Sequence, residues 1–189
     1  MRREAGLQGR RLRRMSRLTR FSRESVSSGG SILQDMPAGG PSLAKPGPLA
    51  IMTSEQIELV RWSFARVLPI KAQAAAIFYD RLFQIAPELR GMFPEDLAAQ
   101  GGKLMAALGF VVGGLDRLGS IIPGVQALAR RHVAYGVEDA HYELVGEALI
   151  WTLDKGLGAA FTPEVRRAWI EAYGLLAEAM IAAARMRAA

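Results

Sequence analysis

The chain after residue 52 is patterned for helices throughout. Its hydrophobic residues recur at intervals of three and four, which places them on one face of an α-helix. The first stripe follows Thr53 and Gln56, whose spacing is that of a capping box. The pattern predicts a short turn at 87–90, a loop at 91–94 and longer helices over about 54–67, 70–85, 97–116, 123–135, 140–155 and 163–185.

No stretch shows the alternation of apolar and polar residues that is typical of strands. Residues 52–189 are long enough for one domain with a substantial core, since half of the whole chain is apolar. We therefore predict an all-α fold of about seven to eight helices for 52–189. Gly101 and Gly102 lie near the start of the 97–116 helix, where they weaken it but allow another group to approach closely.

Residues 1–51 have a different composition. They contain nine arginines by Arg23, followed by segments rich in Ser, Gly and Pro, and we predict a disordered extension. Three interpretations stay open. The segment is an arm that binds anionic membranes or nucleic acid, a targeting segment, or upstream sequence preceding a translation start at Met52.

The net charge of +6 comes from this extension. Residues 1–50 carry a net charge of +7 and residues 51–189 one of −1, so the helical domain has no basic excess to favour nucleic acid. The absence of cysteine excludes disulfides, iron–sulfur clusters and thiolate ligands. The longest apolar run, 104–115, is too short for a transmembrane segment, and we expect a cytoplasmic protein.

Both histidines of the chain lie within 123–146. Pro123 suits the first turn of a helix and Gly136 its end, so the helix predicted between them carries His132 on one face with Val125 and Leu128. A neutral imidazole there can bind a metal through one nitrogen while the other donates to a carbonyl. This pattern alone favours an ordinary core or surface histidine at His132 over a metal ligand.

Five segments of the helical region resemble one known family in their order and approximate spacing. They are 77–83 (IFYDRLF), 87–93 (PELRGMF), 130–132 (RRH), 140–146 (AHYELVG), and Ala168-Trp169 with Ala172-Tyr173-Gly174. Through them the region from Met52 onward resembles the bacterial single-domain haemoglobins and the globin domain of flavohaemoglobins. The resemblance implies a globin fold that carries one b-type haem and its iron.

The resemblance implies a role for residues on both sides of the haem. His132 matches the proximal histidine, the axial ligand of the iron. Phe93 matches the phenylalanine that packs on the haem face, and Tyr79 matches the distal tyrosine whose hydroxyl donates to dioxygen. Gln100 matches the glutamine of the distal helix, and Leu104, one turn later, matches the apolar residue beside the sixth coordination position.

Three further residues are expected at the haem, of which Tyr142 is on the proximal side. Tyr142 matches the tyrosine beside the proximal histidine, and Val145 and Tyr173 belong to the matching segments that follow. His141 begins a predicted helix, where a polar residue is commonly exposed, so we do not expect it to bind the metal.

Two features depart from the flavohaemoglobin pattern. In that family a carboxylate of the last helix supports the proximal histidine. The position that matches this carboxylate is Ala184 here, and Glu178 lies on another face of the helix. Because such a partner makes imidazole a stronger donor, its replacement argues against peroxidase-like chemistry. The sequence also ends at Ala189, so we expect no flavin or nicotinamide domain, and any turnover would need a separate reductase.

The sequence leaves three functions open. The first is reversible binding of O2, with NO and CO as further ligands, for oxygen storage or transport. The second is nitric oxide dioxygenation, hence detoxification, supported by an external flavin reductase. The third is a haem-based sensor or interaction module, for which the basic extension is the candidate contact surface. Monomer and homodimer are both compatible with the sequence.

Overall fold

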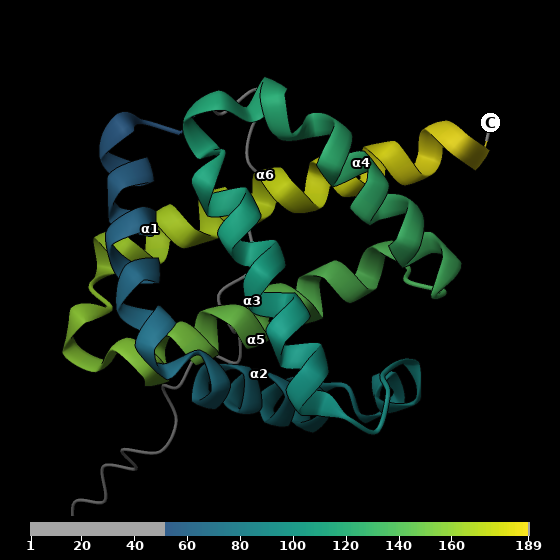
Figure 1. Cartoon of the computed structure of the whole chain (residues 1–189), viewed down its shortest axis with the longest axis horizontal. Helices are drawn as coiled ribbons and strands as arrows, with labels where there is room; N and C mark the ends of the chain where they lie inside the picture. The colour runs from purple at the N-terminus through teal and green to yellow at the C-terminus, as the bar shows by residue number, and fades with distance from the viewer. Residues whose placement is uncertain (1–51, 189) are drawn as a thin grey trace, which may run out of the picture. The chain divides into compact units, whose positions relative to one another are not determined.

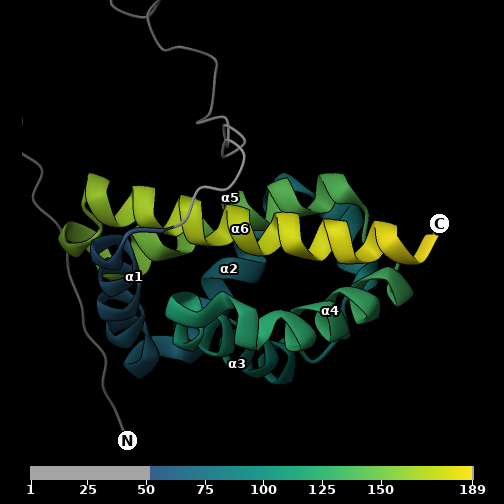
Figure 2. The same cartoon turned by 90° about the horizontal axis from the view of Figure 1, so that it is seen from above.

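The computed structural model describes residues 52–188, and the predicted extension 1–51 lies outside this range. No strand occurs between 52 and 188, which confirms the all-α prediction. Figures 1 and 2 show the helices in two views. In chain order the elements are α1 (Ser54–Val67), η1 (Leu68–Ile70), α2 (Lys71–Ile85), η2 (Pro87–Met92), α3 (Leu97–Gly113), η3 (Leu115–Arg117), α4 (Leu118–Ala134), α5 (Asp139–Leu157), η4 (Gly158–Ala160) and α6 (Pro163–Ala188).

The first two helices begin and end close to where the pattern places them. The capping box of α1 is complete: the Gln56 N–H donates to Thr53 Oγ1 at 3.2 Å, and the Thr53 N–H donates to Gln56 Oε1 at 2.8 Å. Two of the N–H groups that a helix start leaves unpaired are thereby satisfied. Helix α2 ends at Ile85, and the short turn that follows continues as η2 through Met92, two residues beyond the predicted end.

Helix α4 differs from its prediction. It begins at Leu118, so Pro123 lies in the second turn rather than the first. Because proline has no N–H, the carbonyl of Gly119, four residues before Pro123, receives no helical hydrogen bond from it. Gly119 is exposed in the first turn, where water can reach it. Helix α3 in turn ends at Gly113, before the predicted 116, because a second glycine follows and η3 forms the corner.

The start of α5 corrects a second detail. The sequence predicts Asp139 as the cap of the helix at about 140–155, but α5 begins at Asp139 and its N-cap is Glu138. The Glu138 N–H donates to His141 Nδ1 at 3.0 Å, and the His141 N–H donates to the Glu138 backbone carbonyl at 3.0 Å. His141 Nδ1 is therefore engaged at the start of α5.

The helices bury one main core, to which α1, α2, α3, α5 and α6 all contribute. Helix α2 packs on α5 and α3, and α6 packs on α1 and α4. A buried polar link joins α1 to α6: the Trp169 indole N–H donates to Ser63 Oγ at 2.8 Å, and Ser63 Oγ donates to the Leu59 carbonyl. Because buried polar groups are costly when unpaired, this link fixes the register of the two helices.

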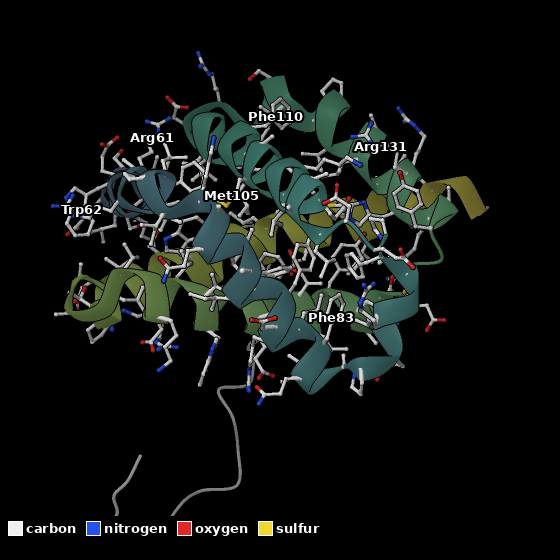
Figure 3. All side chains as sticks on the ribbon, turned by 60° about the horizontal axis from the view of Figure 1, so that its bottom comes forward. Arg61, Trp62, Phe83, Met105, Phe110 and Arg131 are labelled. Atoms are coloured by element: carbon white, nitrogen blue, oxygen red, sulfur yellow. The ribbon has the colours of Figure 1, made fainter. Side chains whose placement is uncertain are left out.

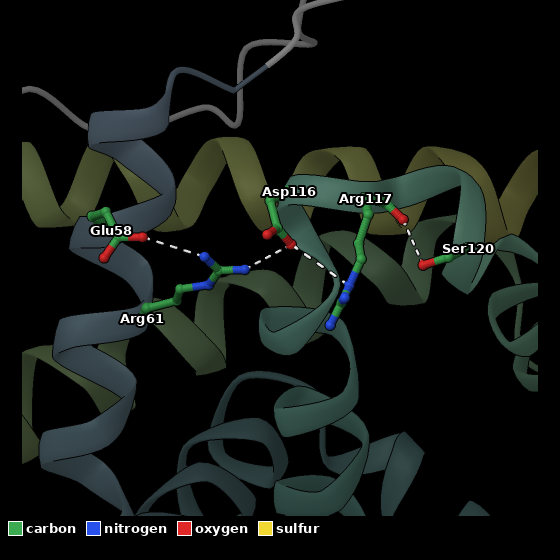
Figure 4. Close-up of polar contacts among 5 residues, drawn as sticks. All are labelled: Glu58, Arg61, Asp116, Arg117 and Ser120. Carbon is green, nitrogen blue, oxygen red and sulfur yellow. Dashed lines mark hydrogen bonds and ion pairs between the residues drawn. The ribbon is translucent and has the colours of Figure 1, made fainter.

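An ion-pair network fixes the corner between α3 and α4 (Figure 4). Arg61 of α1 lies 2.7 Å from Asp116 of η3 and 3.2 Å from Glu58, and Ser120 bonds the carbonyl of Arg117. Each exposed pair contributes about 0–1 kcal/mol. Their joint effect is to tie the segment that turns the chain into α4 to the first helix.

Within residues 52–188, no single helix meets the length and hydrophobicity that a membrane span requires. The pair formed by α3 and the segment Leu115–Ala134 meets these criteria only when taken together, and it is bent by 50°.

Candidate functional site

His132 lies in the last turns of α4 and is half-buried. Its Nδ1 is 3.0 Å from the Leu128 carbonyl, one turn earlier, which fixes the tautomer with the proton on Nδ1. Among the described residues Nε2 makes no hydrogen bond, so it is free to act as a ligand. Burial lowers the pKa of His132, and the charge of Arg131 adds to this effect although the Leu128 bond opposes it. The imidazole is therefore neutral near pH 7, the form that binds metals.

The ring of Tyr142 stacks on His132, with a centroid distance of 6.4 Å and an interplanar angle of 21°. Tyr142 belongs to the first turn of α5, and its backbone carbonyl accepts a 2.6 Å hydrogen bond from the Tyr173 hydroxyl of α6. Burial raises the pKa of Tyr173, which keeps this hydroxyl a donor. Val145, one turn after Tyr142, is partly buried against the main core. The proximal residues expected from the sequence thus gather where α4, α5 and α6 meet.

Tyr79 belongs to α2 and is 3 % exposed. Burial raises its pKa to about 12, although a hydrogen bond with the Gln100 side chain acts in the opposite direction. Gln100, which lies in the first turn of α3, is therefore placed beside the tyrosine hydroxyl. Because its pKa lies far above neutrality, Tyr79 keeps its proton and can donate a hydrogen bond.

Two phenylalanine rings, those of Phe83 and Phe93, pack against Tyr79. The centroid of Phe93, directly after η2, lies 5.4 Å from Tyr79 and 5.4 Å from Phe83, and both pairs are edge-to-face. Tyr79 and Phe83 lie 5.9 Å apart and are stacked. These distances are those of favourable aromatic contacts, worth about 0.5–1.5 kcal/mol per pair beyond area burial. The orientation of Tyr79 therefore depends on Phe93 and Phe83.

Gly101 sets how closely α3 approaches α2. A Cβ atom at this position would lie 2.6 Å from the Cβ of Ala75, closer than real carbon atoms come. At Gly102 the same atom would meet nothing within 4 Å. The expected close approach thus holds for Gly101 and not for Gly102. Leu104, one turn after Gln100, packs against the main core and is partly buried.

We expect Gly101→Ala to lower and Gly102→Ala to raise the free energy of unfolding. Both substitutions gain helix propensity, about 1 kcal/mol relative to glycine. Only the first forces α2 and α3 apart, and overpacking costs about 1–3 kcal/mol. Urea unfolding of both variants isolates the steric effect as their difference. Equal stabilities would show that α2 and α3 separate without cost.

The structure gathers the site residues in two groups on different helices. Tyr79, Phe93, Gln100 and Leu104 come from α2, the loop after η2 and α3, whereas His132 comes from α4. Helices α3 and α4 leave their corner in different directions (Figure 1), and in Figure 3 Phe83 marks the first group and Arg131 the second.

Close contact between α3 and α4 occurs near their corner. A Cβ atom on Gly124 would lie 2.5 Å from the end of the exposed Phe110 ring, so a side chain at this position would require the ring to move. Figure 3 shows Phe110 on this part of α3. Farther from the corner α4 packs on α6, through a small cluster that includes Val125, Ala129 and Met180. The part of α4 that carries His132 is thus held by α6.

The donors at the site fit a ligand that needs one imidazole. Within residues 52–188 no group of three or more His, Asp or Glu side chains is placed to bind a metal ion by itself. One free imidazole nitrogen, a tyrosine–glutamine pair and aromatic and aliphatic walls match a metal that brings its other ligands with it, as a haem does.

Two small cavities lie in the apolar core behind Leu104. The larger, of about 20 Å³, borders Leu104, Phe78 and Thr152, and the other, of about 10 Å³, borders Val111 and Tyr173. A volume of this size holds about one water-sized molecule. Their linings are almost wholly apolar, so the chemistry of the site belongs to the two groups of residues and not to these cavities.

The fold is all-α, and the residues that resemble the globin site occupy two places: His132 in the last turn of α4, and Tyr79 with Gln100 on α2 and α3. Comparisons with known proteins agree. Residues 76–180 match the family model described as Globin. Neuroglobin of Tetraodon nigroviridis is 31% identical over 144 residues, covering 68% of this chain and 90% of that protein. The chain belongs to the globin family.

Other relatives match only in part. The flavohaemoproteins of Bacillus subtilis and Rhodopirellula baltica are 36% and 34% identical over 107 residues, and the match spans only 27% and 26% of their length. The structure of a bacterial globin from Campylobacter jejuni superposes with a TM-score of 0.66 at 24% identity, covering 72% of this chain and 99% of that one. The globin fold is therefore shown, and membership of the family implies haem as the cofactor.

Sequence reasoning assigned no role to Arg90. It is part of the PELRGMF segment, but nothing in that segment indicates what an arginine does there. The structure shows its guanidinium on the backbone of the loop that carries Phe93. Its signal in the sequence is weak: a basic residue three positions before an aromatic one.

Proposed function

We propose that this globin binds one haem b through Nε2 of His132 and reversibly binds O2 on the side of Tyr79 and Gln100. The observation that carries the proposal is the state of His132. Its Nδ1 is bonded to the Leu128 carbonyl, its pKa is lowered by burial, and Nε2 is free. The family supplies the identity of the ligand, and NO and CO are further diatomic ligands of the same site.

When bound, haem iron supplies the coordination position for a diatomic gas. The protein side chains determine how long the gas stays. Tyr79 donates a hydrogen bond to O2, and Gln100 orients that hydroxyl. Phe93 and Leu104 exclude water, which slows oxidation of the metal. On the other side, the Tyr142 ring supports the imidazole, and Tyr173 supports Tyr142 through its backbone carbonyl. Val145, one turn later on α5, is proposed to line the haem.

The experiment that tests this proposal is the visible absorption spectrum of the purified protein in its ferric, dithionite-reduced and reoxygenated states. We expect haem in a ratio of about one per chain and oxygenated bands that persist for minutes. A chain that takes up no haem when haem is supplied in excess would overturn the proposal. Haem uptake followed by immediate oxidation in air would contradict reversible O2 binding.

A second candidate function is nitric oxide dioxygenation. It is favoured by the similarity to two flavohaemoproteins, whose name joins a flavin to a haem. The reaction combines NO and O2 into nitrate with one electron, which a separate flavin reductase would provide from NAD(P)H. The test adds NO to the oxygenated protein with such a reductase present. Sustained nitrate formation over many turnovers supports the enzyme, and a single turnover supports gas binding alone.

A further inference from the structure

Arg90 holds the loop between η2 and α3 by its backbone. Its Nη1 donates to the Phe93 carbonyl at 3.1 Å and to the Pro94 carbonyl at 3.3 Å. The guanidinium carbon lies 5.3 Å from the centroid of the Phe83 ring, within range of a cation–π contact. One half-buried side chain thus contacts both the loop and the aromatic group around Tyr79.

The loop is otherwise held by the packing of the Phe93 ring and by Asp96, whose side chain caps α3. Residues 93–96 belong to no helix, and Pro94 has no N–H to donate. The Phe93 N–H donates to the Arg90 carbonyl at 3.2 Å, so Arg90 binds both the N–H and the carbonyl of Phe93. Without the guanidinium, the carbonyls of Phe93 and Pro94 would lose their hydrogen-bond partner within the described residues.

The charge of Arg90 is directed at these carbonyls. Within residues 52–188 no carboxylate lies at ion-pair distance from its guanidinium, in contrast to Arg81, which pairs with Glu147 at 2.6 Å. Hydrogen bonds from a charged donor are about twice as strong as those between neutral groups. An arginine is suited to this contact because the two N–H groups of Nη1 reach two acceptors while the planar guanidinium lies on the Phe83 ring.

We infer that Arg90 is a positioning residue for the gas-binding pocket: it fixes Phe93, and through the contacts of Phe93 with Tyr79 it fixes the hydroxyl that faces O2. The chain of contact runs from the Arg90 guanidinium to the Phe93 carbonyl, and then from the Phe93 ring to Tyr79 at 5.4 Å. This inference rests on the proposed function for its effect on O2. The anchoring of the loop stands independently of that function.

The test compares Arg90→Met, Arg90→Lys and the matched control Arg81→Met. Arg81 also bonds neighbouring groups and lies over an aromatic ring, that of Trp151 at 4.5 Å, but its guanidinium does not bond the loop. Two readouts are taken on the full chain: amide hydrogen exchange of the 91–97 segment and the O2 dissociation rate. Urea unfolding accompanies both as a measure of global stability.

For Arg90→Met we expect exchange in 91–97 and O2 dissociation each to accelerate about tenfold, the effect of losing about 1.4 kcal/mol of hydrogen bonding. Arg90→Lys keeps the positive charge but not the planar guanidinium. Amide exchange and O2 dissociation should therefore accelerate less than in Arg90→Met. Arg81→Met should change neither, whatever its effect on unfolding. If Arg90→Met does not fold, the comparison of Arg90→Lys with wild type decides by the same two readouts.

The inference is overturned if the 91–97 segment exchanges equally in the Arg90 and Arg81 variants, or if exchange accelerates while O2 dissociation stays unchanged. Failure of the proposed function looks different. In that case the wild-type protein itself retains no haem, while the exchange measurement still reports whether Arg90 anchors the loop.

Discussion

His132→Ala is expected to remove nearly all stably bound haem. The reason is that His132 offers the free imidazole nitrogen of the site, and the chain has only two histidines. Outer-sphere partners of a ligating histidine change metal affinity by about 10- to 100-fold, and loss of the ligand itself should exceed this. The measurement is the Soret absorbance per mole of purified protein, followed by the rate of haem transfer to an excess of a haem acceptor.

The matched control is His141→Ala. His141 accepts a hydrogen bond from the Glu138 N–H and caps α5, so its loss should reduce stability by about 0.5–2 kcal/mol while haem content stays at the wild-type level. Equal haem content and equal transfer rates in both variants would contradict the assignment of His132. Loss of haem in the His141 variant alone would exchange the roles of the two residues.

Tyr79→Phe is expected to raise the O2 dissociation rate by about 10- to 150-fold. A hydrogen bond to an acceptor that carries charge is worth about 1.5–3 kcal/mol, and this variant loses it. The ring that packs against Phe93 and Phe83 stays in place, so the shape of the pocket is kept. Stopped-flow displacement of O2 by CO measures the rate directly.

The pH dependence gives an independent check on Tyr79. Because burial raises its pKa to about 12, the hydroxyl stays protonated and the wild-type dissociation rate should be constant from about pH 6 to about pH 9. Tyr135→Phe is the matched control, since Tyr135 is 64 % exposed and its ring belongs to the other group of site residues, with its centroid 6.5 Å from that of His132. If the O2 dissociation rate changed equally in Tyr79→Phe and Tyr135→Phe, Tyr79 would make no hydrogen bond to the gas.

The local parts of the fold follow from the sequence because their causes lie within a few residues. The capping box of α1 involves Thr53 and Gln56, three residues apart, and its geometry is confirmed. The stripe of Val125, Leu128 and His132 depends only on helical spacing, and the bond from Nδ1 to the Leu128 carbonyl lies within one turn. The all-α class and the presence of His132 on a half-buried helix face were therefore determined by the sequence itself.

Other features depended on contacts between segments far apart in the chain. The sequence treats Gly101 and Gly102 alike, but only Gly101 faces Ala75 of α2. Pro123 is typical of a helix start, yet α4 begins five residues earlier, at Leu118. The chain turns into α4 at a corner that the Arg61–Asp116 ion pair ties to α1. In both cases the deciding neighbour lies on another helix, beyond the reach of any local pattern.

The site itself shows the same division. The family resemblance provided Tyr79, Phe93 and His132 as candidates. The tertiary structure was needed to find two hydrogen bonds to backbone carbonyls, from Tyr173 to Tyr142 and from Arg90 to Phe93. Backbone carbonyls leave no trace in a sequence, because every residue has one. Which carbonyl an arginine or a tyrosine reaches is decided only when helices from different parts of the chain come together.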